Sequence, residues 1–96
     1  MTLRYEMDAA TIPAGPEAAM TGETLYPGKM MAQPQEAVNA ARAFVRDHPG
    51  PDLPRAKVTR RVPGYQNPRN APRVIFRAWR TPDGAYHEER IPPPKG

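Results

Sequence analysis

Residues 72–91 read PRVIFRAWRTPDGAYHEERI, and this stretch decides the fold. Its first half holds Val74-Ile75-Phe76 and Trp79, the most apolar and β-prone run in the chain. It continues into Thr81-Pro82-Asp83-Gly84, which suits a type I turn because Pro takes the second position, Asp the third and Gly the fourth. The pattern predicts a β-hairpin with strands at residues 72–80 and 85–91.

The turn also predicts the register of this hairpin, if Thr81 opposes Ala85. Successive side chains of a strand point to opposite faces. The expected pairs are Trp79 with His87, Arg77 with Glu89 and Ile75 with Ile91 on one face, and Arg80 with Tyr86 and Ala78 with Glu88 on the other. Opposite charges directly across two strands stabilise a pair by a few tenths to about 1 kcal/mol, so we expect Arg77 and Glu89 to help fix this register.

One amphipathic helix is predicted before the hairpin, at residues 33–48. Pro34 takes the first helical position, where its missing N–H costs nothing, and Pro49-Gly50-Pro51 ends the helix. The side chains that share one face at helical spacing are Ala37, Val38, Ala41, Phe44, Val45 and His48. A helix of this length needs docking against a sheet to hold it.

Two further stretches alternate as strands do. One is residues 56–62, and the other is the short run at residues 2–7. The elements together predict an α+β fold, with one amphipathic helix packed on a small antiparallel sheet of three to four strands. The expected core spans residues 34–91, and residues 63–71 form a loop between its strands.

The first 33 residues are predicted to form an extended arm rich in Pro and Gly, with strand 2–7 as its one candidate for regular structure. Residues 8–33 show no sustained hydrophobic period, and their few apolar side chains do not offset the entropy cost of ordering so long a segment. We therefore expect the arm to be ordered only against a partner. Its candidate contacts are Met20, Leu25, Tyr26, Met30 and Met31. Residues 92–96 form a polyproline tail.

Composition excludes several classes of protein. Leu, Ile, Val and Phe make up 13 of the 96 residues, below the roughly 20% at which a packed core becomes doubtful. No apolar run approaches the ~18 residues of a bilayer span, and without cysteine the chain has neither disulfides nor Cys-ligated metal. We expect no cofactor, no metal site and no membrane.

Composition and the N-terminus also suggest an origin and a compartment. The N-terminus resembles neither a signal nor a transit peptide, which indicates a cytoplasmic protein. Ala, Arg, Gly and Pro supply 46 of the residues, as in high-GC bacteria and their phages, so a virion is the other expected location.

Charge is unevenly distributed along the chain. Residues 1–48 carry a balance of −2 and residues 49–96 a balance of +6. The segment from residue 55 to residue 80 has eight basic side chains and no acidic one. It either faces an anion or is a solvated Arg-rich surface.

A nucleic-acid-binding surface in this segment is one interpretation. Arg73, Ile75, Arg77 and Trp79 are expected on one face of a strand, as in a stacking platform with phosphate contacts. The candidate set for nucleic acid or another anionic partner is Arg55, Lys57, Arg60, Arg61, Tyr65, Arg69, Arg73, Arg77, Trp79 and Arg80. In the alternative interpretation, Trp79 packs on the helix and the arginines form a solvated rim. No established nucleic-acid-binding motif is present.

Catalysis is the least favoured interpretation. Tyr86-His87-Glu88 resembles a tripeptide of small microbial ribonucleases, over these three residues only. Such enzymes need a second, acidic histidine, and the other histidine, His48, falls at the end of the predicted helix. His87 and Glu88 are neighbours in a predicted strand, so they point to opposite faces. No catalytic residues are predicted.

Two functions remain. The first is a non-enzymatic structural or interaction subunit of a larger assembly, which docks on protein neighbours through its core and its arms. The second is a nucleic-acid-binding accessory protein that uses residues 55–80.

Overall fold

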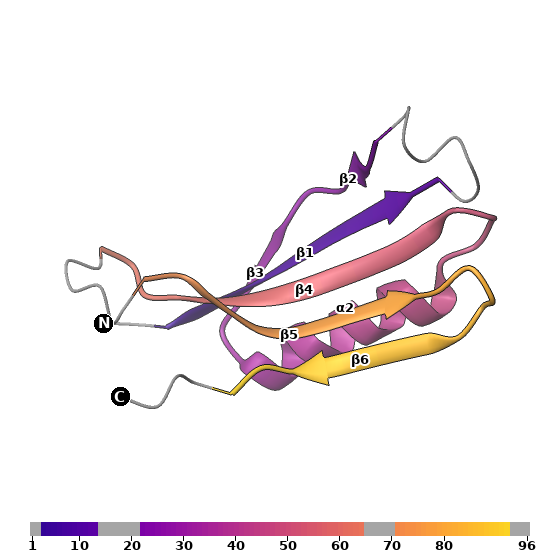
Figure 1. The fold of residues 1–96 in the computed structure, drawn as a ribbon. Coiled ribbons are helices and arrows are strands. Elements are labelled where there is room, and N and C mark those ends of the chain that lie inside the picture. The colour runs from indigo at the N-terminus through magenta and orange to yellow at the C-terminus, as the bar shows by residue number, and fades with distance from the viewer. Residues whose placement is uncertain (1–2, 14–21, 65–70, 93–96) are drawn as a thin grey trace.

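The chain folds as one helix on a six-stranded antiparallel sheet (Figure 1). The computed structural model describes residues 3–13, 22–64 and 71–92. The elements, in chain order, are β1 (Arg4–Ile12), β2 (Thr24–Leu25), β3 (Lys29–Met31), α2 (Pro34–Asp47), β4 (Leu53–Arg61), β5 (Arg73–Arg80) and β6 (Tyr86–Arg90). The predicted α+β class is confirmed, and so is the packing of one helix on an antiparallel sheet.

The strands are ordered β2-β1-β4-β5-β6, and β3 pairs with β1 on the same edge as β2. Strand β1 is therefore an inner strand, held by β4 on one side and by β2 and β3 on the other. Both β3 and β4 run antiparallel to β1. Helix α2 makes the crossover between them and covers one face of the sheet.

The hairpin of β5 and β6 has the register that its turn predicts. Trp79 lies opposite His87, and Arg77 lies opposite Glu89. The Thr81 amide donates to the Ala85 carbonyl at 3.0 Å, and the Gly84 amide donates to the Thr81 carbonyl at 2.8 Å, which closes the β-turn. Gly84 has a φ of 87°, in the left-handed region that glycine adopts without a steric penalty.

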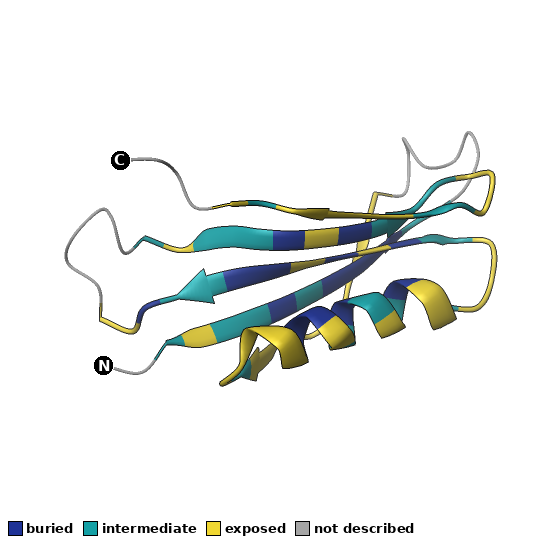
Figure 2. Cartoon of the chain, turned by 90° about the horizontal axis from the view of Figure 1, so that it is seen from below, coloured by how far each residue is buried: buried dark blue, intermediate teal, exposed yellow. Residues whose placement is uncertain are grey.

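The core lies between α2 and the sheet (Figure 2), and it is built largely from small side chains. Five alanines, Ala9, Ala37, Ala41, Ala56 and Ala78, belong to the buried cluster. The largest side chain in it is Phe76, which is only 1% exposed. Small residues let the helix approach the strands closely, so the chain packs a core with few large apolar side chains.

More strands are present than the three to four predicted, and the additional ones come from the segment assigned to an arm. Strand β1 runs nine residues rather than the six of the predicted strand at 2–7. It pairs with β4 at all nine positions, from Arg4 opposite Arg61 to Ile12 opposite Leu53. Alanines and charged residues give β1 a weak hydrophobic alternation, and its strand pairing is a long-range interaction that local pattern does not reveal.

Two register shifts bend the sheet. Between β4 and β5 the pairing changes after Val58, which leaves Ile75 unpaired with β4. Along β1 the partner strand changes from β2 to β3. Three residues, 26–28, lie between these two edge strands, whereas only two residues of β1 lie between the positions that pair with them. Each shift inserts one extra residue on one side of the pairing, as a β-bulge does, and a bulge reorients the side chains beyond it. Among the described residues, no helix is long and apolar enough to cross a membrane.

Candidate functional site

The face of the sheet away from α2, here called the open face, carries five of the ten predicted nucleic-acid-binding residues. Alternation along the strands places on it Glu6, Asp8, Ala10, Arg55, Lys57, Arg61, Arg77, Trp79, His87 and Glu89. These strands form a hollow of about 950 Å³ that is also lined by Glu23 and Leu25 from the neighbouring edge. The hollow lies over β1, β4 and β5, the middle strands of the sheet.

Acidic partners neutralise the basic side chains of the open face. Arg61 forms an ion pair with Glu6 at 2.7 Å, and Arg77 forms one with Glu89 at 2.8 Å. Arg55 is paired with Glu23. Lys57 lies directly opposite Asp8 in the ladder between β4 and β1. The middle of the open face is therefore a set of internal charge pairs, in which the three arginines are already occupied.

Asp8 lies close enough to Glu6, Lys57 and Arg61 for their charges to act on its carboxyl. Burial raises the pKa of its carboxyl above the ordinary value, and repulsion from Glu6 raises it further. The positive charges of Lys57 and Arg61 oppose that rise without cancelling it. The two carboxylates lie close to the edge segment, since a Cβ built on Gly28 would stand 2.8 Å from Asp8 Oδ1.

The structure divides the predicted nucleic-acid-binding set among different places. Arg55, Lys57, Arg61, Arg77 and Trp79 lie on the open face. Tyr65 and Arg69 lie outside the described residues.

The remaining members, Arg60, Arg73 and Arg80, lie on the side of the helix. Arg80 donates to the carbonyl oxygens of Val45 and His48, at 3.2 and 2.9 Å, and so caps the C-terminus of α2. Arg60 is opposite both Tyr5 and Arg73.

The prediction that Arg73, Ile75, Arg77 and Trp79 share one face is wrong. The bulge after Val58 interrupts the alternation of β5, so only Arg77 and Trp79 remain together on the open face. Ile75 packs against the core. A regular Arg–aromatic–Arg platform along β5 is therefore absent from these described residues.

Trp79 is half-buried on the open face beside an imidazole. Its ring stacks on that of His87, with centroids 5.7 Å apart and an interplanar angle of 17°. The indole lines the hollow together with the Arg77–Glu89 pair. One face of the indole is thus already covered from within the chain.

The edge formed by β2 and β3 differs from the open face because it exposes apolar side chains. Leu25 is 73% exposed, Met30 57% and Tyr26 39%. These three residues are here called the apolar edge. The Tyr26 ring also makes an edge-on contact with Phe44, at 5.2 Å between centroids. Of the other residues predicted to contact a partner, Met31 packs against the core instead, and Met20 lies outside the described residues.

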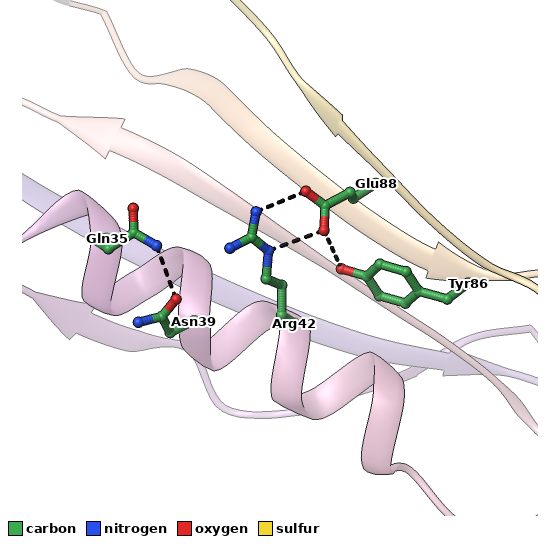
Figure 3. Close-up of polar contacts among 5 residues, drawn as sticks. All are labelled: Gln35, Asn39, Arg42, Tyr86 and Glu88. Atoms are coloured by element: carbon green, nitrogen blue, oxygen red, sulfur yellow. Dashed lines mark hydrogen bonds and ion pairs between the residues drawn. The ribbon is translucent and has the colours of Figure 1, made fainter.

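A polar cluster on the other face connects the helix to β6 (Figure 3). Arg42 donates to both carboxylate oxygens of Glu88, at 3.0 and 2.8 Å, and the Tyr86 hydroxyl donates to Glu88 at 2.8 Å. The hydrogen bonds from Arg42 and Tyr86 lower the pKa of Glu88 to about 2. The Arg46 guanidinium lies 4.7 Å from the centre of the Tyr86 ring.

This cluster separates the residues of the ribonuclease-like tripeptide. Glu88 faces the helix and is bound by Arg42, whereas His87 lies on the open face against Trp79. The second imidazole, His48, contacts Phe44 and Tyr26 at the end of the helix. The two histidines thus lie on opposite faces of the sheet and do not share a site.

Within residues 3–13, 22–64 and 71–92, no group of three His, Asp or Glu side chains is arranged to hold a metal ion. Comparison of the chain with protein-family models, with curated proteins and with solved structures gives no match. The geometry of the surfaces is therefore the basis for the function proposed below.

Sequence reasoning missed the acidic half of the open face. Glu6, Asp8 and Glu23 come from the segment assigned to an arm, and their partners come from the basic segment some 30 to 55 residues later. The signal that was available is the alternation of charge at Arg4, Glu6 and Asp8. It indicates a strand with one charged face.

Proposed function

We propose that the protein is a non-enzymatic interaction subunit that binds a protein partner through the apolar edge. The observation that carries this proposal is the concentration of exposed apolar side chains. All three large hydrophobic residues found exposed in the described part of the chain fall within residues 25–30. A cluster of this kind on a soluble surface is typical of a protein–protein contact.

The rest of the described surface offers a partner less apolar area. The outward positions of α2 are polar or small, with Gln35, Glu36, Asn39, Ala43 and Asp47 exposed. The open face is occupied by ion pairs. Removing such ion pairs from water costs free energy. Burying Leu25 and Met30 against a partner is favourable instead, because it removes apolar surface from water.

The chemistry of the edge fits an apolar patch on another protein. Met30 has an unbranched, polarizable side chain that adapts to irregular surfaces. Tyr26 presents an aromatic ring and a hydroxyl, a combination that is enriched at interfaces. A pair of charges, Glu23 and Lys29, borders these side chains in the sequence and supplies a polar rim.

Site-specific photo-crosslinking in cells of the source organism tests this proposal. A photoreactive amino acid at position 30 is expected to give one discrete product that survives nuclease treatment. The same group at position 39, on the outer side of α2, is expected to give none. Leu25→Asp should abolish the product, and the matched variant Ala43→Asp should leave it intact.

Three outcomes would refute the proposal. The first is no product from position 30, and the second is equal products from positions 30 and 39. The third is a product with the mass of two copies of this chain, which would identify the occupant of the edge as a second copy.

A further inference from the structure

One end of the sheet gathers four arginines, of which, among the described residues, only Arg61 has an acidic partner, Glu6. Strands β1 and β5 begin at this end and β4 finishes there (Figure 1). The ladders place Arg4 directly opposite Arg61 on the open face, and Arg60 directly opposite Arg73 on the side of the helix. These four residues are here called the arginine end.

Both cross-strand pairs join like charges. Residues directly opposite in an antiparallel ladder have Cβ atoms about 4.5–5.5 Å apart, and like charges at that spacing destabilise the sheet. Within the ladder positions 4–6, 59–61 and 73–74, the only acidic residue is Glu6, and it is paired with Arg61. In the described part of the chain, Arg4, Arg60 and Arg73 form no ion pair.

The middle of the sheet also has a like-charge pair, because Lys57 lies directly opposite Arg77, but carboxylates accompany it. Arg55, Lys57 and Arg77 each face a carboxylate, from Glu23, Asp8 and Glu89 respectively. The sheet therefore supplies acidic partners in the middle and, among the described residues, leaves Arg4, Arg60 and Arg73 without one at this end. In addition, the Nε atom of Arg73 is buried with no hydrogen-bond partner in the described structure, so a donor stands without an acceptor.

From this contrast we propose that the arginine end binds the phosphate backbone of a nucleic acid. A guanidinium presents a planar fork of donors that matches phosphate oxygens. Nucleic acids carry negative charge at a close and regular spacing, so one strand can contact both arginines of a cross-strand pair together. Folded acidic proteins carry carboxylates at a lower density, which favours nucleic acid as the occupant.

The proposal does not depend on the apolar edge, and it differs from a binding surface spread over residues 55–80. It includes Arg4, which lies outside that segment. It leaves out Arg55 and Arg77, which form ion pairs, Lys57, which lies opposite Asp8, and Arg80, which caps the helix.

Salt-dependent binding to a fluorescent single-stranded DNA oligonucleotide tests the proposal. For single strands, each phosphate contact contributes about 0.7 to the slope of log affinity against log salt. Arg60→Gln with Arg73→Gln should therefore lower the slope by about 1.4. The loss of affinity between about 50 and 200 mM salt then becomes about sevenfold smaller than in the unmodified protein.

A charge-matched control separates this site from general electrostatic attraction. Lys57→Gln with Arg77→Gln also removes two positive charges, but from positions that face carboxylates. This variant should keep the slope of the unmodified protein. Circular dichroism of both variants checks that each is folded, and Arg4→Gln gives a single-site measurement that leaves the Arg60–Arg73 pair intact.

Several results would overturn the proposal. Absence of binding at low salt would do so, because electrostatic affinity is greatest there. An equal loss of slope in the Lys57 and Arg77 variant would show diffuse attraction instead of a site. Competition by polyglutamate as effective as competition by DNA, at equal charge concentration, would assign the surface to acidic proteins.

Discussion

Glu88 ties the edge strand β6 to the helix, through two hydrogen bonds from Arg42 and one from Tyr86. Its pKa in the folded protein is about 2, below the ordinary value of 4.5. A depressed pKa contributes stability that is fully present above the unfolded value and is lost as pH falls through the folded one. This contribution should therefore decline between about pH 4.5 and pH 2.

We expect Glu88→Gln to destabilise the protein at pH 7 by no more than about 1 kcal/mol, because the pair is partly exposed and screened by solvent. The difference from the unmodified protein should disappear near pH 2. Urea denaturation at a series of pH values measures it. Glu89→Gln is the control, and it should cost less because the Arg77–Glu89 pair is about half exposed. A difference that persists undiminished at pH 2 would contradict the role assigned to this carboxylate.

Arg60 is a residue whose removal should stabilise the fold. It lies opposite Arg73, so Arg60→Glu converts a like-charge pair into an opposite-charge pair. We expect the free energy of unfolding to rise by about 0.2–1 kcal/mol. The same variant should lose affinity for nucleic acid. Chemical denaturation measures the gain, and a net loss of stability would show that Arg60 has a structural partner within the fold.

Among the aromatic residues of the core, Phe76 and not Phe44 is expected to dominate stability. Phe76 on β5 is 1% exposed beneath the helix, while Phe44 lies at the margin of α2 and is only partly buried. Phe76→Ala should cost roughly 3–5 kcal/mol. Phe44→Ala should cost less than half of that, because its side chain is only partly buried. Equal losses in equilibrium unfolding would mean that the helix docks mainly through Phe44.

The hairpin and the helix were predictable from sequence because their signals are local. Residues 81–84 specify a turn and thereby the register of β5 and β6. Strand β1 was predictable only in its first residues, since Ala9 and Ala10 carry little hydrophobic signal and its pairing with β4 is distant in sequence. The bulge at Ile75 also has no local signature, and it overturned the expected shared face of Arg73 and Arg77.

Across the whole molecule, the two halves of the chain are joined by charge as well as by packing. The negative balance of the first half and the positive balance of the second meet on the open face, where Glu6 and Glu23 pair with Arg61 and Arg55. The basic segment that suggested nucleic-acid binding from sequence is therefore neutralised in part, because Arg55, Arg61 and Arg77 form ion pairs. Arg60 and Arg73 of the same segment lie at the arginine end without an ion pair among the described residues.

Deleting residues 1–31 should abolish cooperative folding. The deletion removes inner strand β1, both strands of the apolar edge and the core residues Met7 and Ala9. It also exposes one edge of β4 along nine residues. Thermal unfolding followed by circular dichroism should show no sigmoidal transition. A midpoint close to that of the full chain would mean that these residues form a detachable arm.

Amide hydrogen exchange of the free, full-length protein tests most directly the claim that β1 is an inner strand on which both proposed surfaces depend. Residues 5–7 and 10–11 have strands on both sides, so their amides should be protected to a degree similar to residues 56–58 of β4. Rapid exchange throughout residues 4–12, with β4, β5 and β6 protected, would contradict the account. Such a result would mean that the first third of the chain is a mobile arm and that the charges of the basic segment lack these acidic partners.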